Sequence, residues 1–257
     1  MLKKIVFSFF IIFSLSVSNT ILSEELKFHT QDFSPFNYAI DGKVSGPAAD
    51  IISLVCSRIM VDCSSRLLPW RRAQRGVKDG DAHGLFVIGW NKKRAEWLHY
   101  SPPIMKTEYG FFVRDDNNLN YSQSKDVAGL KVGVFGPSNT SSSLEKIKSQ
   151  MIENGVNPIS IDLRPDDESG FKKLGSGRVN AVYSNRDVGY SLLRKLNIKN
   201  VRYAGAHKQL KYYIGFAKAH TDKTLVDKFN AELNILYQQG KLQEILSSYQ
   251  MESAEIE

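Results

Sequence analysis

Cysteine and proline are scarce in this sequence, and glycine is not enriched. The 257 residues include two cysteines, which are too few to build a metal site from cysteines alone. Only 8 prolines and 18 glycines are present, and 42% of the residues are hydrophobic, so the composition is neither that of a disordered chain nor that of a fibrous one. We therefore expect a globular protein with one large domain or two smaller ones.

The sequence also lacks the motifs of common enzymes. It has no His-Glu-x-x-His, no Gly-x-Ser-x-Gly and no glycine-rich phosphate loop. Its five histidines are scattered without the spacing of metal ligands. The acidic run Asp166, Asp167 and Glu168 is interpreted as the negatively charged start of a helix. We expect no metal, no cofactor and no catalysed reaction.

Long hydrophobic runs are missing except at the N-terminus. Two lysines there precede the apolar residues 5–15, a run shorter than the roughly 20 residues that a membrane-spanning helix needs. Small residues follow, with expected cleavage after Ser18 or Ser23. Residues 1–23 are therefore predicted to be a secretory signal peptide, and the mature protein to be soluble in the periplasm.

Positive charge is in modest excess. The formal net charge is +7, and removal of the two lysines of the predicted signal peptide lowers it to +5. Lysine and arginine are dispersed along the chain rather than clustered. Export and this dispersed pattern argue against a nucleic-acid partner.

The two cysteines, Cys56 and Cys63, fall near the end of an expected helix and the start of an expected strand. In an oxidising compartment a disulfide between them would close a short loop and stabilise the fold by about 2 to 3 kcal/mol on the chain-entropy model. Two unpaired thiols are the alternative that the sequence leaves open at this point.

Short β-forming runs alternate with amphipathic helical patterns along the chain. One helix is expected to start at Pro47, and two more end the chain, the first capped by Thr221 and the second set off by Gly240. Strands are expected at 26–30, 63–68, 84–88, 109–114, 131–135, 159–163, 180–183, 201–204 and 212–217. This alternation predicts an α/β protein with mostly parallel sheets. The polar stretch 115–126 marks a candidate domain boundary.

A series of short motifs, in order along nearly the whole mature chain, resembles a known family. The motifs are Asp32-Phe33-Ser34-Pro35-Phe36, Gly46 with Asp50, Gly80-Asp81-Ala82, Lys93-Arg94 before Tyr100-Ser101-Pro102-Pro103, Leu130-Lys131-Val132-Gly133-Val134, Leu174 before Gly177-Arg178-Val179-Asn180-Ala181-Val182, Tyr213-Ile214-Gly215-Phe216-Ala217-Lys218, and Gly240-Lys241-Leu242. Their order and spacing resemble the family 3 solute-binding proteins of bacterial ABC transporters, which include periplasmic amino-acid-binding proteins.

This resemblance implies the type II periplasmic-binding-protein fold, an α/β architecture of two lobes joined by a two-strand hinge. Lobe 1 would consist of residues 24–112 and 213–257, and lobe 2 of residues 113–212, with the ligand in the cleft between them. It also implies a Cys56–Cys63 disulfide, as in the basic-amino-acid binders of the family. The protein would be a monomer that delivers a small ligand to the membrane permease of an ABC transporter.

The resemblance assigns candidate ligand groups for a carboxylate. Arg94 matches the family's carboxylate-binding arginine, and a guanidinium can hold a carboxylate with two hydrogen bonds. A solvated basic run with Lys92 and Lys93 is the alternative. Three polar residues that should open the first helix of lobe 2 can donate to the same anion, with ordinary helix capping as the alternative. These residues are Ser138, Asn139 and Thr140.

Aromatic residues are expected to form the apolar side of the site. One of Phe33 and Phe36, together with Trp70, should contact the ligand, although aromatic residues most often lie in a core. Arg72 is a second candidate cation, with a surface helix position as its alternative.

Asn185 stands where amino-acid binders of the family usually have an aspartate for the ligand's α-ammonium group. An amide can accept a hydrogen bond from an ammonium group but supplies no charge. Asp187 is the expected substitute if the local turn differs. The ligand is therefore left open among an amino acid, an organic acid, a modified amino acid and a small peptide.

Two other functions remain open on the same scaffold. One is a periplasmic enzyme similar to the cyclohexadienyl dehydratases, which would need Asp187, Asp32 or Glu108 as an acid or base in the cleft. The other is a ligand-sensing module that acts on a receptor.

Overall fold

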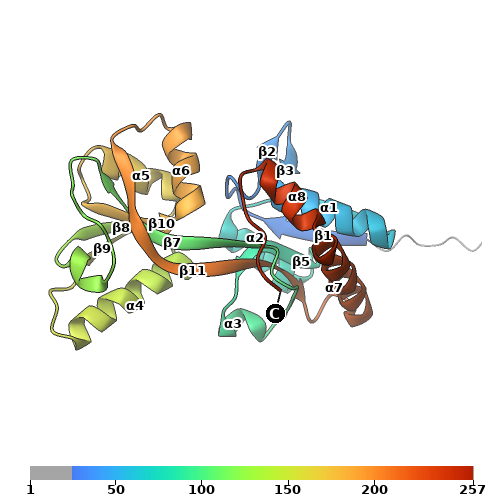
Figure 1. Cartoon of the computed structure of the whole chain (residues 1–257). Helices are drawn as coiled ribbons and strands as arrows, with labels where there is room; N and C mark the ends of the chain where they lie inside the picture. The colour runs from blue at the N-terminus through green and yellow to red at the C-terminus, as the bar shows by residue number, and fades with distance from the viewer. Residues whose placement is uncertain (1–24, 257) are drawn as a thin grey trace, which may run out of the picture.

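The protein consists of two α/β lobes that lie side by side, as a computed structural model of the chain shows (Figure 1). The structure describes residues 25–256, so the predicted signal peptide lies outside the described residues. Two strands, β7 (Met105–Arg114) and β11 (Val201–Ala217), run from one lobe into the other. No helix within residues 25–256 is long and apolar enough to cross a membrane.

The first lobe has helices on both faces of its part of the sheet. Its strands are β1 (Glu25–Thr30), β4 (Asp62–Leu67), β5 (Gly84–Gly89) and β6 (Leu98–Tyr100), with a hairpin of β2 (Tyr38–Ile40) and β3 (Lys43–Ser45). Its helices are α1 (Pro47–Ile59), α2 (Trp70–Asp79), α3 (Lys92–Ala95), α7 (Lys223–Gln238) and α8 (Lys241–Ser248). Phe86 of β5 faces the core under α1, α7 and α8, whereas Leu85 faces α2, because successive strand residues alternate in direction.

The second lobe repeats this arrangement. Its strands are β8 (Lys131–Phe135), β9 (Ser160–Arg164) and β10 (Ala181–Asn185), and its helices are α4 (Asn139–Glu153), α5 (Asp167–Gly175), α6 (Arg186–Lys195) and the short 3₁₀ helix η1 (Ser124–Val127). Leu144 and Ile147 of α4 pack on one face of the sheet. Phe171 and Leu174 of α5 pack on the other. Each lobe therefore has its own two-sided core.

One continuous sheet connects the lobes, in the strand order β4-β1-β5-β11-β7-β10-β8-β9, with β6 also paired to β11. Neighbouring strands are parallel within each lobe, namely β1 with β4 and β5, and β8 with β9 and β10. The two long strands are antiparallel to each other and to their other neighbours. The expectation of mostly parallel strands therefore holds for β1, β4 and β5 and for β8, β9 and β10. The pairs that involve the long strands β7 and β11 are antiparallel, as is the β2–β3 hairpin.

The core contacts of the long strands change from one lobe to the other. On β7, Met105 packs in the core of the first lobe and Tyr109 in that of the second. On β11, Ala204 belongs to the second lobe's core and Tyr212 to the first. The lobe boundaries expected after residues 112 and 212 stay predictions.

Two details differ from the sequence-based expectations. The strands expected at 201–204 and 212–217 are one strand, β11, whose register shifts twice, near Gly205 and near His207. Helix α7 is capped by Asp222, whose Oδ1 accepts from the backbone N–H groups of Thr224 and Leu225. Thr221 instead donates its hydroxyl to the carbonyl of His83, so the expected cap was wrong by one residue.

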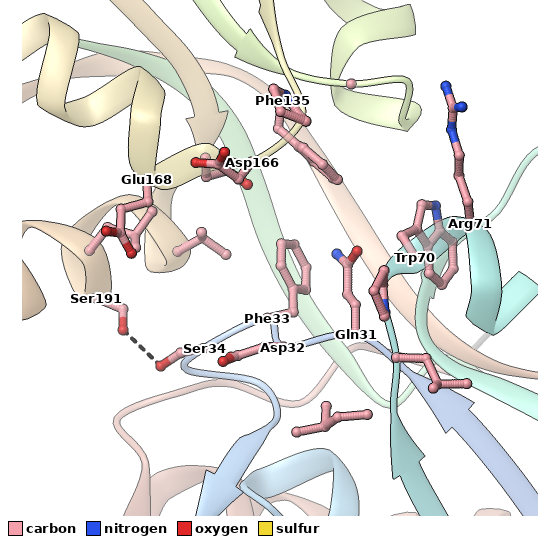
Figure 2. A pocket seen from close by; sticks show the side chains of 18 of the residues that line it. Gln31, Asp32, Phe33, Ser34, Trp70, Arg71, Phe135, Asp166, Glu168 and Ser191 are labelled. Atoms are coloured by element: carbon pink, nitrogen blue, oxygen red, sulfur yellow. Dashed lines mark hydrogen bonds between the residues drawn. The ribbon is translucent and has the colours of Figure 1, made fainter.

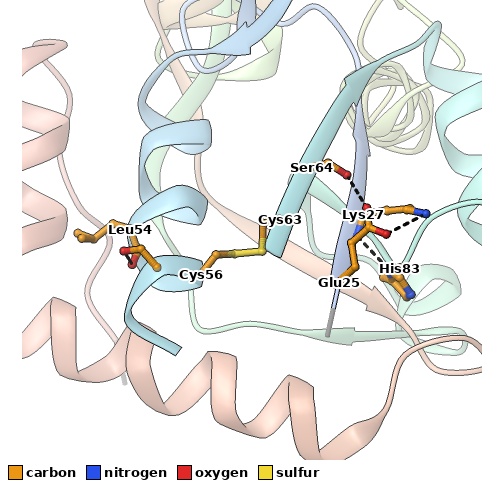
Figure 3. Close-up of a disulfide and its surroundings, with 8 residues drawn as sticks. Glu25, Lys27, Leu54, Cys56, Cys63, Ser64 and His83 are labelled. Carbon is orange, nitrogen blue, oxygen red and sulfur yellow. Dashed lines mark hydrogen bonds and ion pairs between the residues drawn. A yellow bond between two sulfur atoms is a disulfide. The ribbon is translucent and has the colours of Figure 1, made fainter. Parts of the chain in front are cut away.

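Cys56 and Cys63 form a disulfide that links the end of α1 to the start of β4 (Figure 3). Their Cα atoms lie 6.1 Å apart. The loop between them turns at Met60, which has a left-handed backbone conformation at the helix end. The disulfide therefore fixes a helix-to-strand connection in the first lobe.

Candidate functional site

Two adjoining chambers lie between the lobes. A wide chamber of about 910 Å³ and a narrow chamber of about 40 Å³ share the lining residues Gln31, Phe33, Trp70 and Phe135. The wide chamber is also lined by residues that include Asp32, Ser34, Asp166, Glu168 and Ser191 (Figure 2). Asp167 lines it as well. The narrow chamber is also lined by residues that include Arg94, Tyr109, Ser138, Asn139, Thr140 and Tyr212.

The strand order explains why the chambers are here. Lining segments directly follow the carboxyl ends of β1 and β4 in the first lobe and of β8 and β9 in the second. Ligands of open α/β sheets bind outside the carboxyl ends of the strands. The fold therefore brings these ends of both lobes together around one space.

Arg94 is a buried cation without a carboxylate partner among the described residues. Only 9% of its surface is exposed. Its Nη1 donates to the carbonyl oxygen of Gly89 at 3.0 Å, and its guanidinium lies 5.1 Å from the ring centre of Trp70. Burial lowers the pKa of Arg94 from its usual range, but a guanidinium stays charged in proteins. Its remaining donors suit an anion in the narrow chamber.

The local fold sets the direction of this side chain. Asn91 caps the short helix α3 by accepting a hydrogen bond from the backbone N–H of Arg94 at 2.8 Å. Lys92 and Lys93 on the same helix are exposed, in contrast to Arg94. The run therefore divides into one buried arginine that lines the narrow chamber and two lysines on the surface.

Tyr109 and Tyr212, from the two long strands, form the polar floor of the narrow chamber. The Tyr109 hydroxyl is hydrogen-bonded to Thr140 and to Tyr212. Burial raises the pKa of both phenols, so both are neutral hydrogen-bonding groups at neutral pH. Sequence reasoning missed them because tyrosines in strands are most simply read as core residues.

Asn185 is not available to a ligand in this structure. Its side-chain nitrogen donates to Thr107 Oγ1 at 2.8 Å and to Tyr212 Oη at 3.1 Å. Its side-chain oxygen caps α6 by accepting from the backbone N–H groups of Asp187 and Val188. Asp187 Oδ2 accepts from the Thr107 hydroxyl at 2.7 Å, and neither Asn185 nor Asp187 lines a chamber. Asparagine is a favoured helix cap, and in this role the side-chain oxygen of Asn185 is already hydrogen-bonded to the protein.

The residues at the start of α4 all line the narrow chamber. Ser138 caps this helix, because its Oγ accepts from the backbone N–H of Ser141. Asn139 reaches the other lobe, where its Oδ1 accepts from Asn91 Nδ2 at 2.8 Å and its Nδ2 donates to the Gly89 carbonyl at 3.3 Å. Helix capping and a place at the chamber wall therefore occur together.

The aromatic candidates separate into lining and core residues. Phe33 and Trp70 line both chambers, as does Phe135, which the sequence analysis did not select. Phe36 is 1% exposed and packs behind Phe33, with ring centres 5.4 Å apart. The structure therefore brings Phe33 to the chambers and leaves Phe36 in the core.

The second predicted cation is also placed elsewhere. Arg72 is exposed and lines neither chamber, whereas Arg71 lines the wide one (Figure 2). Both lie in the first turn of α2, where consecutive residues point about 100° apart. The sequence motif could not decide which of the two neighbouring arginines faces the cleft.

Of the three acids in the run 166–168 that line the wide chamber, Asp167 has the fewest partners, and the other lining acid, Asp32, is exposed. Asp166 caps α5 by accepting from the backbone N–H of Ser169, and Glu168 forms ion pairs with lysines 172 and 195. Asp167 accepts one hydrogen bond, from Ser184 Oγ at 2.9 Å, and has no ion pair within residues 25–256. Burial raises the pKa of Asp167 to about 6. The helix-start interpretation of the acidic run missed this side chain.

The three carboxylates expected for an enzyme are also dispersed. Asp32 lines the wide chamber, but Asp187 does not. Glu108 accepts hydrogen bonds from Arg186 and Tyr203, both at 3.1 Å, and lines neither chamber.

Similar folds occur in proteins of several functions. One similar structure comes from work on glutathione import through GshT and the cystine ABC importer TcyBC of Streptococcus mutans, with a TM-score of 0.79 and 18% identity over 91% of this chain and 98% of that chain. A histidine kinase sensor domain with similarity to periplasmic binding proteins has a TM-score of 0.77 and 18% identity over 88% and 96%. An ancestral amino-acid-binding protein, a precursor of cyclohexadienyl dehydratase, has a TM-score of 0.72 and 16% identity over 87% and 94%.

These likenesses show the fold, and the sequence itself identifies the family. No curated protein sequence matches the chain. The family model for the bacterial extracellular solute-binding proteins, family 3, matches residues 27–252. The chain therefore belongs to family 3 of the bacterial extracellular solute-binding proteins.

Proposed function

We propose that this protein captures a small carboxylate-bearing solute, an amino acid or a related compound, in its cleft and delivers it to the permease of an ABC transporter. The site of action is the periplasm, and the protein acts as a monomer. The single observation that carries the proposal is the buried guanidinium of Arg94, which lines the narrow chamber without a carboxylate partner among the described residues. A buried charge is costly unless it is paired, and a ligand carboxylate would supply the partner.

Capture depends on closure of the two lobes. Three hydrogen bonds cross the cleft. Asn139 is bonded to Asn91 at 2.8 Å and to the Gly89 carbonyl at 3.3 Å, and the hydroxyls of Ser34 and Ser191 are bonded to each other at 2.8 Å. A ligand that contacts both walls binds the closed state more tightly than the open state and shifts the population toward it. A permease could then distinguish the loaded protein from the empty one by its shape.

The arrangement favours binding over catalysis. Catalysis of a dehydration would need an acid or base held against the reacting atoms. Two of the three carboxylates expected for an enzyme lie outside the chambers, and the third, Asp32, is exposed. Asp167 lines the wide chamber but is a single acid, hydrogen-bonded to Ser184 Oγ. We therefore propose that the protein performs no reaction on its ligand.

A thermal-shift screen of residues 24–257, followed by calorimetric titration, tests this function. The compounds are L-amino acids, organic acids, polyamines and short peptides. A ligand at about 100 times its dissociation constant should stabilise the protein by about 2.7 kcal/mol. The Arg94→Ala variant should lose binding of every carboxylate that the wild type binds. The control is Arg75→Ala, because Arg75 lies on the surface of the same lobe with 83% of its side chain exposed.

Two results would contradict the proposal. One is that Arg94→Ala binds its carboxylate ligand as tightly as the wild type. The other is that only polyamines without a carboxylate bind.

A further inference from the structure

We propose that the ligand is a short peptide, held with its C-terminal carboxylate on Arg94 in the narrow chamber and its N-terminal ammonium group on Asp167 in the wide chamber. This inference rests on the proposed function, because it names the ligand class of the same cleft. It makes Asp167 a specificity-determining residue.

The narrow chamber is much smaller than the wide one, at about 40 Å³ against about 910 Å³, and it has the charge for a carboxylate group. Arg94 is its charged residue, and no aspartate or glutamate lines it. An α-ammonium group attached to the same carbon as the carboxylate would therefore enter a chamber whose lining contains no carboxylate.

Asn185 does not supply a partner for that ammonium group, because it lines neither chamber. Both its side-chain nitrogen and its side-chain oxygen are already hydrogen-bonded within the protein, as described above. The nitrogen on the carbon that carries the ligand carboxylate would therefore meet neutral groups such as the Tyr109 and Thr140 hydroxyls. A peptide N–H meets that condition, because it is a neutral hydrogen-bond donor.

The negative charge for the ligand's ammonium group comes from Asp167, which lines the wide chamber and not the narrow one. Asp167 has a single hydrogen-bond partner, the Ser184 hydroxyl. The raised pKa of Asp167 has the same origin, because burial without an ion pair disfavours the carboxylate. A ligand ammonium group beside it would remove that penalty. Arg94 and Asp167 are thus two opposite charges, each lacking an ion-pair partner within residues 25–256, in adjoining chambers.

The segment between these charges suits the middle of a peptide. Three aromatic residues, Phe33, Trp70 and Phe135, line both chambers together with Gln31, so the region where the chambers meet is mainly apolar. The wide chamber, at about 910 Å³, lies near the upper end of the roughly 300 to 1,000 Å³ that is common for ligand pockets. It can hold the side chains of a dipeptide or tripeptide, whereas a free α-amino acid would leave most of it to water.

Calorimetric titration with four matched compounds tests the inference on residues 24–257. The compounds are L-leucyl-L-alanine, its N-acetyl form, its C-terminal amide, and free L-leucine. We expect the unmodified dipeptide to bind at least about tenfold more tightly than each of the other three, because each lacks one charge or the separation between charges. The comparison on the wild-type protein does not depend on any variant folding correctly.

Three variants then assign the charges to residues. Asp167→Asn should bind the dipeptide about tenfold more weakly but bind the N-acetyl form as the wild type does. Arg94→Ala should lose the preference for the free carboxylate over the amide. The control Asp227→Asn alters an exposed aspartate on α7 and should change neither affinity.

Each unfavourable result is specific. Equal affinity for L-leucine and the dipeptide, equal affinity for the dipeptide and its N-acetyl form, or no binding of the dipeptide at millimolar concentration overturns the peptide assignment. If Arg94→Ala still abolishes binding of another carboxylate, the proposed function survives that result. If Arg94→Ala leaves all affinities unchanged, the proposed function fails as well.

Discussion

Asn91 of the first lobe donates a hydrogen bond of 2.8 Å to Asn139 of the second, beside the guanidinium of Arg94. The carbonyl oxygen of Gly89 accepts from both Arg94 and Asn139. The group that we propose for the ligand carboxylate therefore shares an acceptor with the residue that joins the lobes. We expect closure of the lobes and binding at Arg94 to be linked through these contacts.

The contacts of Asn139 should hold the cleft closed even without a ligand. Asn139→Ala removes its two hydrogen bonds to the first lobe, and a hydrogen bond contributes about 1 kcal/mol net. We expect the ligand-free variant to have a larger radius of gyration than the ligand-free wild type in small-angle X-ray scattering. The control is Asn154→Ala, which changes an exposed asparagine at the end of the same helix. Identical scattering curves for wild type and Asn139→Ala would show that this contact does not hold the lobes together.

Arg94 should lower the stability of the empty protein. It is buried without a counter-ion among the described residues, and an apolar side chain of similar length avoids that cost. We expect Arg94→Met to raise the free energy of unfolding of the ligand-free protein by about 1 kcal/mol while carboxylate binding is lost. Urea unfolding measures the change, with the exposed Arg75→Met as the control. A variant less stable than the wild type would mean that the cation–π and Gly89 contacts outweigh the cost of burial.

Asp167 should make the stability of the empty protein depend on pH. Its pKa is about 6 in the folded protein, above the ordinary value of 3.8, so the folded state binds the proton more tightly than the unfolded state. The stability of the wild type should therefore fall as the pH rises from about 4 to about 6. Asparagine does not ionise, so Asp167→Asn should be more stable than the wild type at pH 7 by about 1 to 3 kcal/mol, and no more stable at pH 4.

Urea unfolding of both proteins at pH 4 and pH 7 measures this difference. The exposed Asp227→Asn variant is the control, and it should differ little from the wild type at either pH. An equal effect of Asp167→Asn at the two pH values would mean that Asp167 does not titrate in this range.

The disulfide should matter for stability but not for binding. It closes a short loop in the first lobe, and its loss should lower the free energy of unfolding by about 2 to 3 kcal/mol on the chain-entropy model. Neither cysteine lines a chamber. We expect the Cys56→Ala, Cys63→Ala double variant to melt at a lower temperature and to bind its ligand with wild-type affinity at 25 °C. Loss of affinity in a folded variant would contradict the second part.

Much of the fold could be predicted because local signals agree with the tertiary structure. Pro47 begins α1, Gly240 separates α7 from α8, and the strand expected at 131–135 is β8. The central part of β11 could not be predicted, because exposed residues such as Lys208 and Gln209 interrupt the alternation of a half-buried strand. That part of the strand runs between the lobes, where its partner is β7 and not a core.

The candidate site was harder to predict from the sequence than the fold. Whether a residue can contact a ligand depends on where its side chain points and on which protein groups already bond to it. Arg94 could be recognised from its place in a motif. Arg71 and Arg72 are adjacent in the sequence, and only the start of α2 decides which one faces the cleft. Asn185 matches a ligand position, yet its hydrogen bonds to Thr107, Tyr212 and the start of α6 leave it none for a ligand. Such long-range hydrogen bonds have no signature in a single sequence.

The most direct test of the account is a crystal structure of residues 24–257 with the tightest-binding carboxylate compound from the screen. We predict that a carboxylate oxygen of the ligand lies within hydrogen-bonding distance of the Arg94 guanidinium, in the chamber lined by Tyr109 and Thr140. A ligand bound elsewhere, or bound in the cleft with its carboxylate away from Arg94, would contradict the central claim.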